Sequence, residues 1–203
     1  MSDCEQKARC AAIVLAAGAS TRLGQPKQLL RLDGESLLRR TVRLAFEAGC
    51  SPVFAVLGFN AQRMQQELLV SGAKVVVNPN WRSGMGSSLR CGISALMAED
   101  PVPPKTMLLV CDQARLSGES LSELIRVNAQ GRSLITASRY ASRLGVPAIF
   151  DKQLYADLLK VEGDQGARSV IQRYLDQTTT VEFHDGIIDI DTPDDLIDLG
   201  VNS

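Results

Sequence analysis

Residues 11–27 read AAIVLAAGASTRLGQPK. The first six of these residues are apolar, which predicts a short buried strand. The small residues that follow, including Gly18, let the main chain turn so that its N–H groups are free to bind an anion. Two cations, Arg22 and Lys27, lie at the far end of the loop. This stretch therefore predicts a strand that leads into a phosphate-binding loop.

The loop differs from the common nucleotide-binding motifs. Ala16 and Ala17 occupy the early glycine positions of G-x-G-x-x-G, and no G-K-[ST] sequence identifies a Walker loop. The alternative interpretation is an ordinary strand-to-helix turn in which Arg22 and Lys27 are solvated. The combination of small residues and two cations favours the anion-binding loop.

Apolar runs recur along the whole chain and are nearly continuous, as expected for strands covered on both faces by helices. Segments with helical periodicity separate them. The pattern predicts an α/β fold, a three-layer Rossmann-like sandwich with a mostly parallel central sheet. The predicted strands are 11–16, 52–57, 73–77, 106–111, 133–137, 146–150 and 180–183, and the predicted helices are 36–48, 61–70, 87–97, 118–128, 151–159 and 167–175.

The composition favours a small-molecule partner. The 203 residues include 22 Lys and Arg against 23 Asp and Glu, so no overall charge favours nucleic acid or a membrane surface. No stretch approaches the about 18 apolar residues that span a bilayer. The five cysteines form no CxxC pair and are interpreted as reduced thiols of a cytoplasmic protein. We expect a tail at 1–10 and a single domain over 11–203.

Two carboxylates follow apolar strands. Asp112 comes directly after the predicted strand 106–111, where ligands bind in open α/β sheets. Asp191 lies in the sequence Asp-Thr-Pro-Asp-Asp at a second strand-to-helix junction. Each has a structural alternative, because Asp112 can cap a helix or turn and Asp191 can begin an ordinary helix.

The ordered set of motifs resembles the molybdenum cofactor nucleotidyltransferases, within the wider nucleotidyltransferase superfamily. The resemblance spans nearly the whole chain. It rests on LAAGASTRLGQPK at 15–27, NPNW at 78–81, GMGSSL at 84–89, CDQ at 111–113, GVP at 145–147, GDQGAR at 163–168 and DIDTP at 189–193.

The resemblance implies a nucleotide-diphospho-sugar transferase-like fold and a set of catalytic roles. Arg22 and Lys27 would hold a triphosphate, with Lys27 nearest the α-phosphate, where fixed cations stabilise the transition state. Asp112 would join them as a catalytic residue and would hold Mg²⁺ together with Asp191. The nucleotide-binding residues implied are Leu15, Ala16, Ala17, Gly18, Arg22, Lys27, Gly86, Ser87, Ser88 and Asp112.

The resemblance also suggests where the base and the acceptor bind. Gly86, Ser87 and Ser88 would lie near the base and ribose, although Ser87 could instead be the N-cap of a helix. Gly163 and Arg168 would lie on the acceptor side, although Arg168 could be a solvated first-turn arginine. His184 and Trp81 are interpreted as residues outside the site. The family usually reads Asp-Gln-Pro after the central strand, but Ala114 replaces the proline, which leaves the placement of Gln113 open.

The implied reaction is Mg²⁺-dependent transfer of a nucleoside monophosphate from a nucleoside triphosphate to molybdopterin, with release of pyrophosphate. CTP is favoured and GTP is the second choice, and a molybdoenzyme that receives the product would be a further partner. One alternative is a nucleotide-binding chaperone or accessory protein for a molybdoenzyme. Another is transfer onto a sugar phosphate or alcohol phosphate. The occurrence of Asp112 and Asp191 together favours an enzyme, because binding alone does not need both metal ligands.

Overall fold

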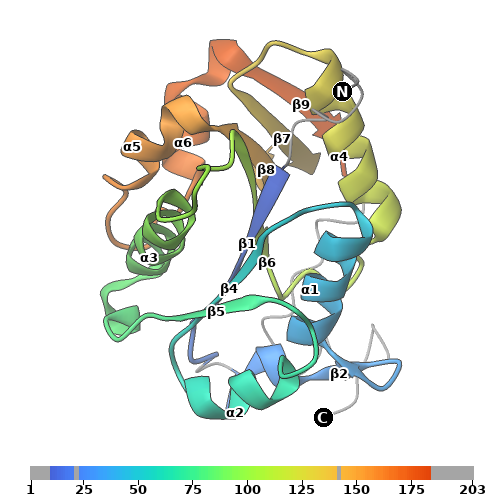
Figure 1. Cartoon of the computed structure of the whole chain (residues 1–203), viewed down its shortest axis with the longest axis vertical. Helices are drawn as coiled ribbons and strands as arrows, with labels where there is room; N and C mark the ends of the chain where they lie inside the picture. The colour runs from blue at the N-terminus through green and yellow to red at the C-terminus, as the bar shows by residue number, and fades with distance from the viewer. Residues whose placement is uncertain (1–9, 21–22, 141–142, 184–203) are drawn as a thin grey trace.

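The computed structural model describes residues 10–20, 23–140 and 143–183. Within this part of the chain, a seven-stranded sheet forms the centre of the molecule, with helices on both faces (Figure 1). The α/β prediction is confirmed. In spatial order the strands are β5 (Lys74–Val77), β4 (Val53–Leu57), β1 (Cys10–Ala16), β6 (Lys105–Val110), β8 (Arg143–Asp151), β7 (Ile135–Tyr140) and β9 (Thr178–Glu182).

The sheet is mostly parallel, as predicted. β1 pairs in parallel with β4 and β6, whereas β8 is antiparallel to both of its neighbours, β6 and β7. β8 begins at Arg143, earlier than the predicted start at residue 146, because Arg143 and Leu144 pair with Tyr140 and Arg139 of β7. These added residues belong to β8 because β7 pairs with them. They are not part of a continuous apolar run, so the sequence pattern did not predict them.

The helices form two layers that bury opposite faces of the sheet (Figure 1). Along β1, Ala12 and Val14 pack into one apolar cluster, and Ala11 and Ile13 pack into the other. Both faces are thus buried, which explains the continuous apolar runs. One layer contains α1 (Leu37–Glu47) and α4 (Gly118–Gln130), and the other contains α3 (Met85–Met97), α5 (Tyr155–Leu158) and α6 (Arg168–Arg173).

Three predicted helices are shorter in the structure. α2 (Ala61–Glu67) ends before Leu69 and Val70, which are 80% and 81% exposed, so their apolar character did not indicate burial. α5 is preceded by a 3₁₀ turn, η4 (Lys152–Leu154), and α6 is followed by another, η5 (Leu175–Gln177). A small hairpin of β2 (Arg31–Leu32) and β3 (Glu35–Ser36) was not predicted.

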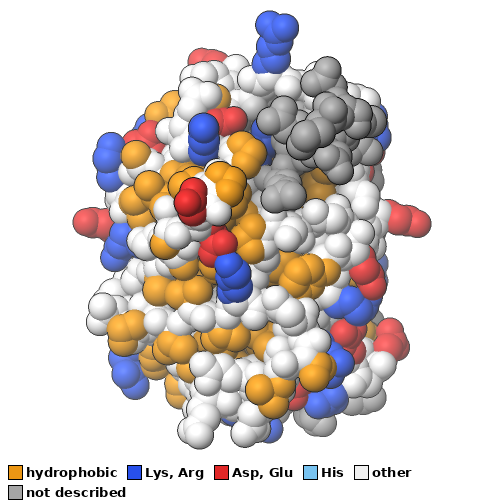
Figure 2. Space-filling view, viewed as in Figure 1, with side chains coloured by type: hydrophobic (Ala, Val, Ile, Leu, Met, Phe, Trp, Pro, Cys, Tyr) orange, Lys and Arg blue, Asp and Glu red, His pale blue; other side chains and the backbone are white. Residues whose placement is uncertain are grey.

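Charged side chains of both signs are interspersed over the face seen in Figure 2. Among the residues that the structure describes, no helix combines the length and the apolar character needed to cross a bilayer. The predicted domain over 11–203 ends within 184–203, outside the described residues, so its limits remain a prediction. Cys10, which the sequence assigned to the tail, begins β1 and pairs with Lys105 of β6.

Candidate active site

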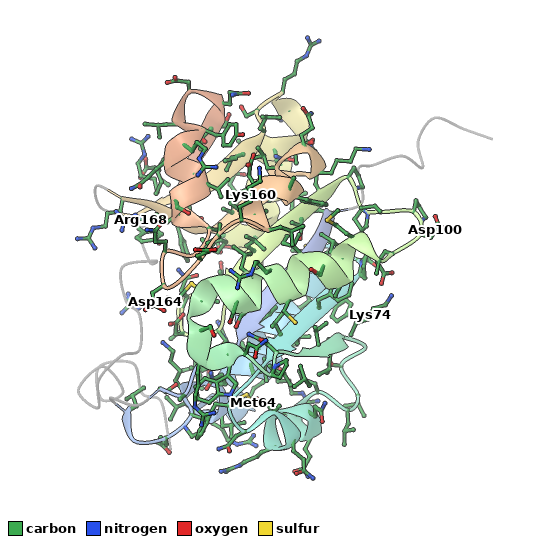
Figure 3. The ribbon with its side chains drawn as sticks, turned by 90° about the vertical axis from the view of Figure 1, so that its left-hand side faces the viewer. Met64, Lys74, Asp100, Lys160, Asp164 and Arg168 are labelled. Atoms are coloured by element: carbon green, nitrogen blue, oxygen red, sulfur yellow. The ribbon has the colours of Figure 1, made fainter. Side chains whose placement is uncertain are left out.

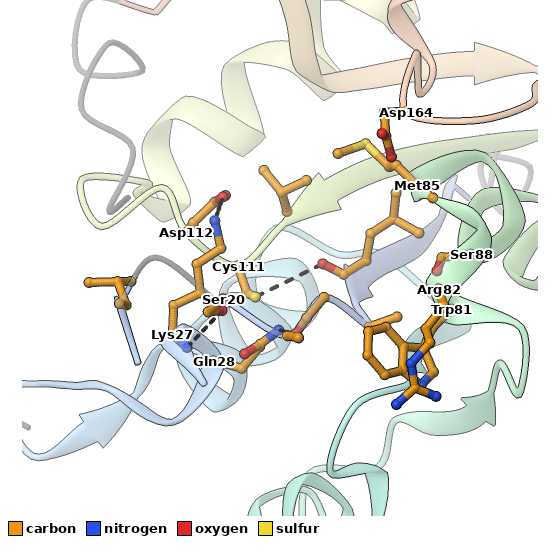
Figure 4. A pocket seen from close by; sticks show the side chains of 17 residues that line it. Ser20, Lys27, Gln28, Trp81, Arg82, Met85, Ser88, Cys111, Asp112 and Asp164 are labelled. Atoms are coloured by element: carbon orange, nitrogen blue, oxygen red, sulfur yellow. Dashed lines mark hydrogen bonds and ion pairs between the residues drawn. The ribbon is translucent and has the colours of Figure 1, made fainter. Parts of the chain in front are cut away.

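A cavity of about 460 Å³ opens where β1 and β6 end, at the carboxyl edge of the parallel strands (Figure 4). This is the edge at which open α/β sheets bind ligands. Two walls face each other across it. We call the lining residues within 15–20, 23–28 and 110–112 the loop wall, and the lining residues within 81–85, together with Ser88 and Asp164, the helix wall.

In the loop wall, three successive main-chain carbonyls accept hydrogen bonds. The carbonyl of Ala17 accepts a hydrogen bond from the Phe59 N–H (3.0 Å). Gln28 Nε2 donates to the carbonyls of Ala16 (3.2 Å) and Gly18 (2.7 Å). Gly18 and Ala19 line the cavity, and their N–H groups have no hydrogen-bond partner among the described residues. Main-chain N–H groups without a partner are available to bind an anion, but the predicted anion-binding role of the loop stays a prediction.

Lys27 and Asp112, 85 residues apart in the chain, meet in the same wall. Lys27 begins the 3₁₀ turn η2 (Lys27–Leu29), its N–H donates to Ser20 Oγ (3.1 Å), and its Nζ donates to Asp112 Oδ2. The two side chains are only 19% and 18% exposed. A cation and a carboxylate are thus held together in the loop wall (Figure 4).

The second carboxylate oxygen of Asp112 supports the predicted metal role. Asp112 Oδ1 is buried and accepts no hydrogen bond within the described part of the chain. A buried acceptor without a partner is costly, and a carboxylate oxygen of this kind is a ligand that Mg²⁺ prefers. The other predicted ligand, Asp191, and the predicted phosphate ligand Arg22 lie outside the described residues. Within the described ranges, no three His, Cys, Asp or Glu residues form a metal-binding group.

The segment after Asp112 is well anchored although Ala114 replaces the family proline. Gln113 is buried and its Nε2 donates to the Val146 carbonyl (3.0 Å). Ala114 packs in an apolar cluster with Leu30 and Leu37. The position of Gln113, which the sequence left open, is thus fixed by burial and by this hydrogen bond.

Trp81 lies in the helix wall, although we had placed it outside the site. It begins the 3₁₀ turn η3 (Trp81–Ser83), and its ring meets Phe59 edge-on at 5.6 Å between centroids. The Arg82 guanidinium lies 4.5 Å from the centroid of the Trp81 ring. A side chain at Gly58 would come within 2.6 Å of Trp81 Cβ, so this glycine allows the close packing. The sequence signal that could have indicated this wall is the Asn-Pro-Asn motif at 78–80, which directly precedes Trp81.

The serine-rich segment divides between the cavity and its support. Ser88 lines the cavity, whereas Gly86 and Ser87 do not. Ser87 Oγ accepts from Asn78 Nδ2 (2.9 Å), and α3 has Gly84 as its N-cap, so the prediction of Ser87 as an N-cap is wrong. The Gly86 N–H donates to the Gly163 carbonyl (2.8 Å). The assignment of Gly86 and Ser87 to nucleotide binding stays a prediction.

The predicted acceptor residues lie near the helix wall but not on the cavity surface. Gly163 supports Gly86, and Arg168 is exposed at the start of α6. Asp164, which the sequence analysis did not single out, lines the cavity itself. Figure 3 shows Asp164 close to the start of α3 and Arg168 further out. Sequence reasoning also missed other lining residues, namely Ser20, Gln28, Arg82 and Met85.

Cys111 is the thiol in the loop wall. Burial, followed by the adjacent Asp112 carboxylate, raises the pKa of this thiol to about 12. Only a thiolate is a strong nucleophile, so Cys111 is inert near neutral pH. Among the described residues, the loop wall thus contains one cation, Lys27, and one carboxylate, Asp112, without an activated thiol.

The profile of the MobA-like NTP transferase domain matches residues 12–178. The chain belongs to this family. The match begins in β1, ends at the start of β9, and includes both walls of the cavity. Membership identifies the chain as a nucleotidyltransferase of the MobA-like type. Lys27 and Asp112, the two charged residues of the loop wall, lie within the matched residues.

The individual relatives are named for different activities. Nicotine blue oxidoreductase of Paenarthrobacter nicotinovorans is 33% identical over 79% of this chain and 80% of its own. Molybdenum cofactor cytidylyltransferase of Escherichia coli is 23% identical over 91% and 92%. Among solved structures, Rv0371c from Mycobacterium tuberculosis H37Rv is 29% identical with a TM-score of 0.80 and coverage of 94% and 97%. Its manganese complex has 28% identity, the same coverage and a TM-score of 0.76.

Proposed function

We propose that this protein transfers a nucleoside monophosphate from a nucleoside triphosphate to molybdopterin and releases pyrophosphate. CTP is the favoured donor and GTP the second choice. The observation that supports transfer best is the pairing of Lys27 with Asp112 in the wall that also contains Gly18 and Ala19, whose N–H groups have no partner within the described part of the chain. Triphosphate binding and stabilisation of its reacting phosphorus require donors and a cation at one point.

In the proposed reaction, a phosphate oxygen of the acceptor attacks the α-phosphorus of the nucleotide. A new P–O bond forms there, and the bond from the α-phosphorus to the bridging oxygen breaks, so that pyrophosphate leaves with the bonding electrons. The loop amides orient the phosphates, and Lys27 moves from Asp112 to the α-phosphate oxygens. No protein nucleophile is needed, in agreement with the protonated state of Cys111.

Asp112, together with Asp191, would hold Mg²⁺. The ion would supply charge neutralisation of the triphosphate when bound. The unpartnered Asp112 Oδ1 supports this role, and the manganese complex of the related mycobacterial protein agrees with a divalent ion. Arg22 would add a second cation to the phosphate site.

The choice of molybdopterin and CTP rests on similarity. The related Escherichia coli protein is a molybdenum cofactor cytidylyltransferase, and a relative from Opitutus terrae is named as a probable guanylyltransferase for the same cofactor. Gly86, Ser87 and Ser88 would serve the base and ribose, and Gly163 with Arg168 would serve the acceptor. A molybdoenzyme would receive the product.

The test is release of pyrophosphate from each of the four nucleoside triphosphates, with Mg²⁺ and molybdopterin. We expect release with CTP, weaker release with GTP, and none when either Mg²⁺ or the acceptor is omitted. If pyrophosphate is released only with sugar phosphates or alcohol phosphates, one of these is the acceptor in place of molybdopterin. Triphosphate binding without release under any condition would favour the chaperone alternative. If the protein neither binds a nucleoside triphosphate nor releases pyrophosphate, and instead oxidises or reduces a nicotinamide dinucleotide, nucleotidyl transfer is contradicted.

A further inference from the structure

Gln28 is an amide in an unusual place. It is 1% exposed, it lies one residue after Lys27, and it borders the cavity. Its Nε2 donates two hydrogen bonds, both to main-chain carbonyls of the phosphate-binding loop, those of Ala16 and Gly18. Its Oε1 is buried and has no partner among the described residues.

This arrangement costs folding free energy that a residue with only a space-filling role would not need to lose. A buried acceptor without a hydrogen bond costs about 1–3 kcal/mol. The oxygen of Gln28 therefore contributes no stabilising hydrogen bond from within the described chain. What Gln28 provides is a pair of donors aimed at the loop.

Those donors control the direction of the loop amides. A trans peptide unit is planar, and its C=O and N–H bonds point in opposite directions. Holding the Gly18 carbonyl on the Gln28 side therefore turns the N–H of Ala19 the other way, and the bond from Phe59 to the Ala17 carbonyl does the same for the N–H of Gly18. Both amides belong to residues that line the cavity.

We propose that Gln28 is a positioning residue that holds the loop so that the N–H of Ala19 is presented to the phosphates of the nucleotide. The inference rests on the proposed function, because it assumes that a triphosphate occupies the cavity. Gln28 does not itself touch the reacting atoms. It acts through the carbonyls of Ala16 and Gly18, and its loss lets these peptide units rotate.

Two variants test this role, Gln28→Met and Gln28→Glu. Methionine keeps the approximate length without a donor, and an ionised glutamate keeps the shape but only accepts. We expect both variants to bind the preferred nucleoside triphosphate and inorganic triphosphate about 10-fold more weakly. Turnover should fall by up to about 100-fold, the scale of a small misplacement at a reacting centre. Calorimetric titration, competition with inorganic triphosphate and pyrophosphate release measure these effects.

Asn128→Leu is the matched control. Asn128 is also a buried amide with two side-chain hydrogen bonds, to Thr136 and from Lys105, but Lys105 begins β6 and so lies at the end of that strand opposite Asp112. We expect this variant to lower the melting temperature while leaving triphosphate affinity unchanged. If Gln28 has a positioning role, triphosphate affinity falls in the Gln28 variants and not in Asn128→Leu.

Wild-type affinity for inorganic triphosphate in Gln28→Met and Gln28→Glu would overturn the inference and leave the proposed function standing. An equal loss of affinity in Asn128→Leu would also overturn it, because the effect would then follow general stability. A wild-type protein that binds no triphosphate and releases no pyrophosphate would overturn both proposals.

Discussion

The two walls of the cavity are built in different ways. In the loop wall, Lys27 and Asp112 pair with each other, both are largely buried, and the main chain around them is tied by Gln28. In the helix wall, Met85 is 45% exposed and Asp164 lies on an exposed loop. A preorganised wall can stabilise a transition state, whereas an open one can adapt to different ligands. We infer that the loop wall determines the reaction, whereas the helix wall, with Gly163 behind it, contributes to the choice of nucleotide and acceptor.

The largest expected effect is that of Lys27→Ala in the loop wall. Removing one preorganised cation should lower turnover by roughly 10²- to 10³-fold, because charge on the α-phosphate oxygens is then stabilised less. Steady-state pyrophosphate release measures it, with circular dichroism as the control for folding. Near-normal turnover would remove Lys27 from the mechanism.

Asp112→Asn and Asp191→Asn, made separately, test the metal role. The amide keeps the shape but loses the anionic ligand, so activity at fixed Mg²⁺ should fall about 10²-fold and the Mg²⁺ needed for half-maximal activity should rise. Titration of activity with Mg²⁺ and with Mn²⁺ measures both changes. Full activity in either variant would mean that the corresponding carboxylate is only a cap.

Gly84→Ala tests the helix wall. Gly84 has φ +90°, and an added Cβ would lie 2.6 Å from both Asp164 Oδ1 and the Gly163 carbonyl. The loop must move, so we expect KM for the acceptor to rise about 10-fold while turnover at saturation changes little, as for a loss of uniform binding. Gly49→Ala is the control, because Gly49 has φ +87° and no atom within 4 Å of the added Cβ. A large fall in turnover in Gly84→Ala alone would contradict the division of roles.

The smallest effect concerns Cys111. Because burial raises the pKa of its thiol to about 12, the reactive thiolate is scarce at pH 8 and becomes common only as the pH approaches that value. We expect iodoacetamide at pH 8 to leave Cys111 unlabelled and activity within about 2-fold of the untreated enzyme. Peptide mass mapping checks the labelling. Rapid labelling of Cys111 at pH 8 would show that the loop wall opens in solution.

Much of the fold was predictable because the buried strands are marked by continuous apolar runs, and the two-layer covering explains those runs. The outer elements were less predictable. Leu69 and Val70 look like part of a helix but are exposed, and the start of β8 depends on pairing with β7. Local sequence carries no information on such pairing, because the partner strand supplies it.

By itself, the sequence determined the strand at 11–16, the loop of small residues that follows it, and the place of Asp112 at the end of an apolar run, because each is a local pattern of side chains. Only the tertiary structure decided that Lys27 meets Asp112, that Trp81 and Asp164 line the cavity, and that Gly86 and Ser87 turn away from it. The physical reason is strand register. The parallel pairing of β1 with β6 brings two strand ends to one edge, and no local pattern specifies which distant side chains meet there.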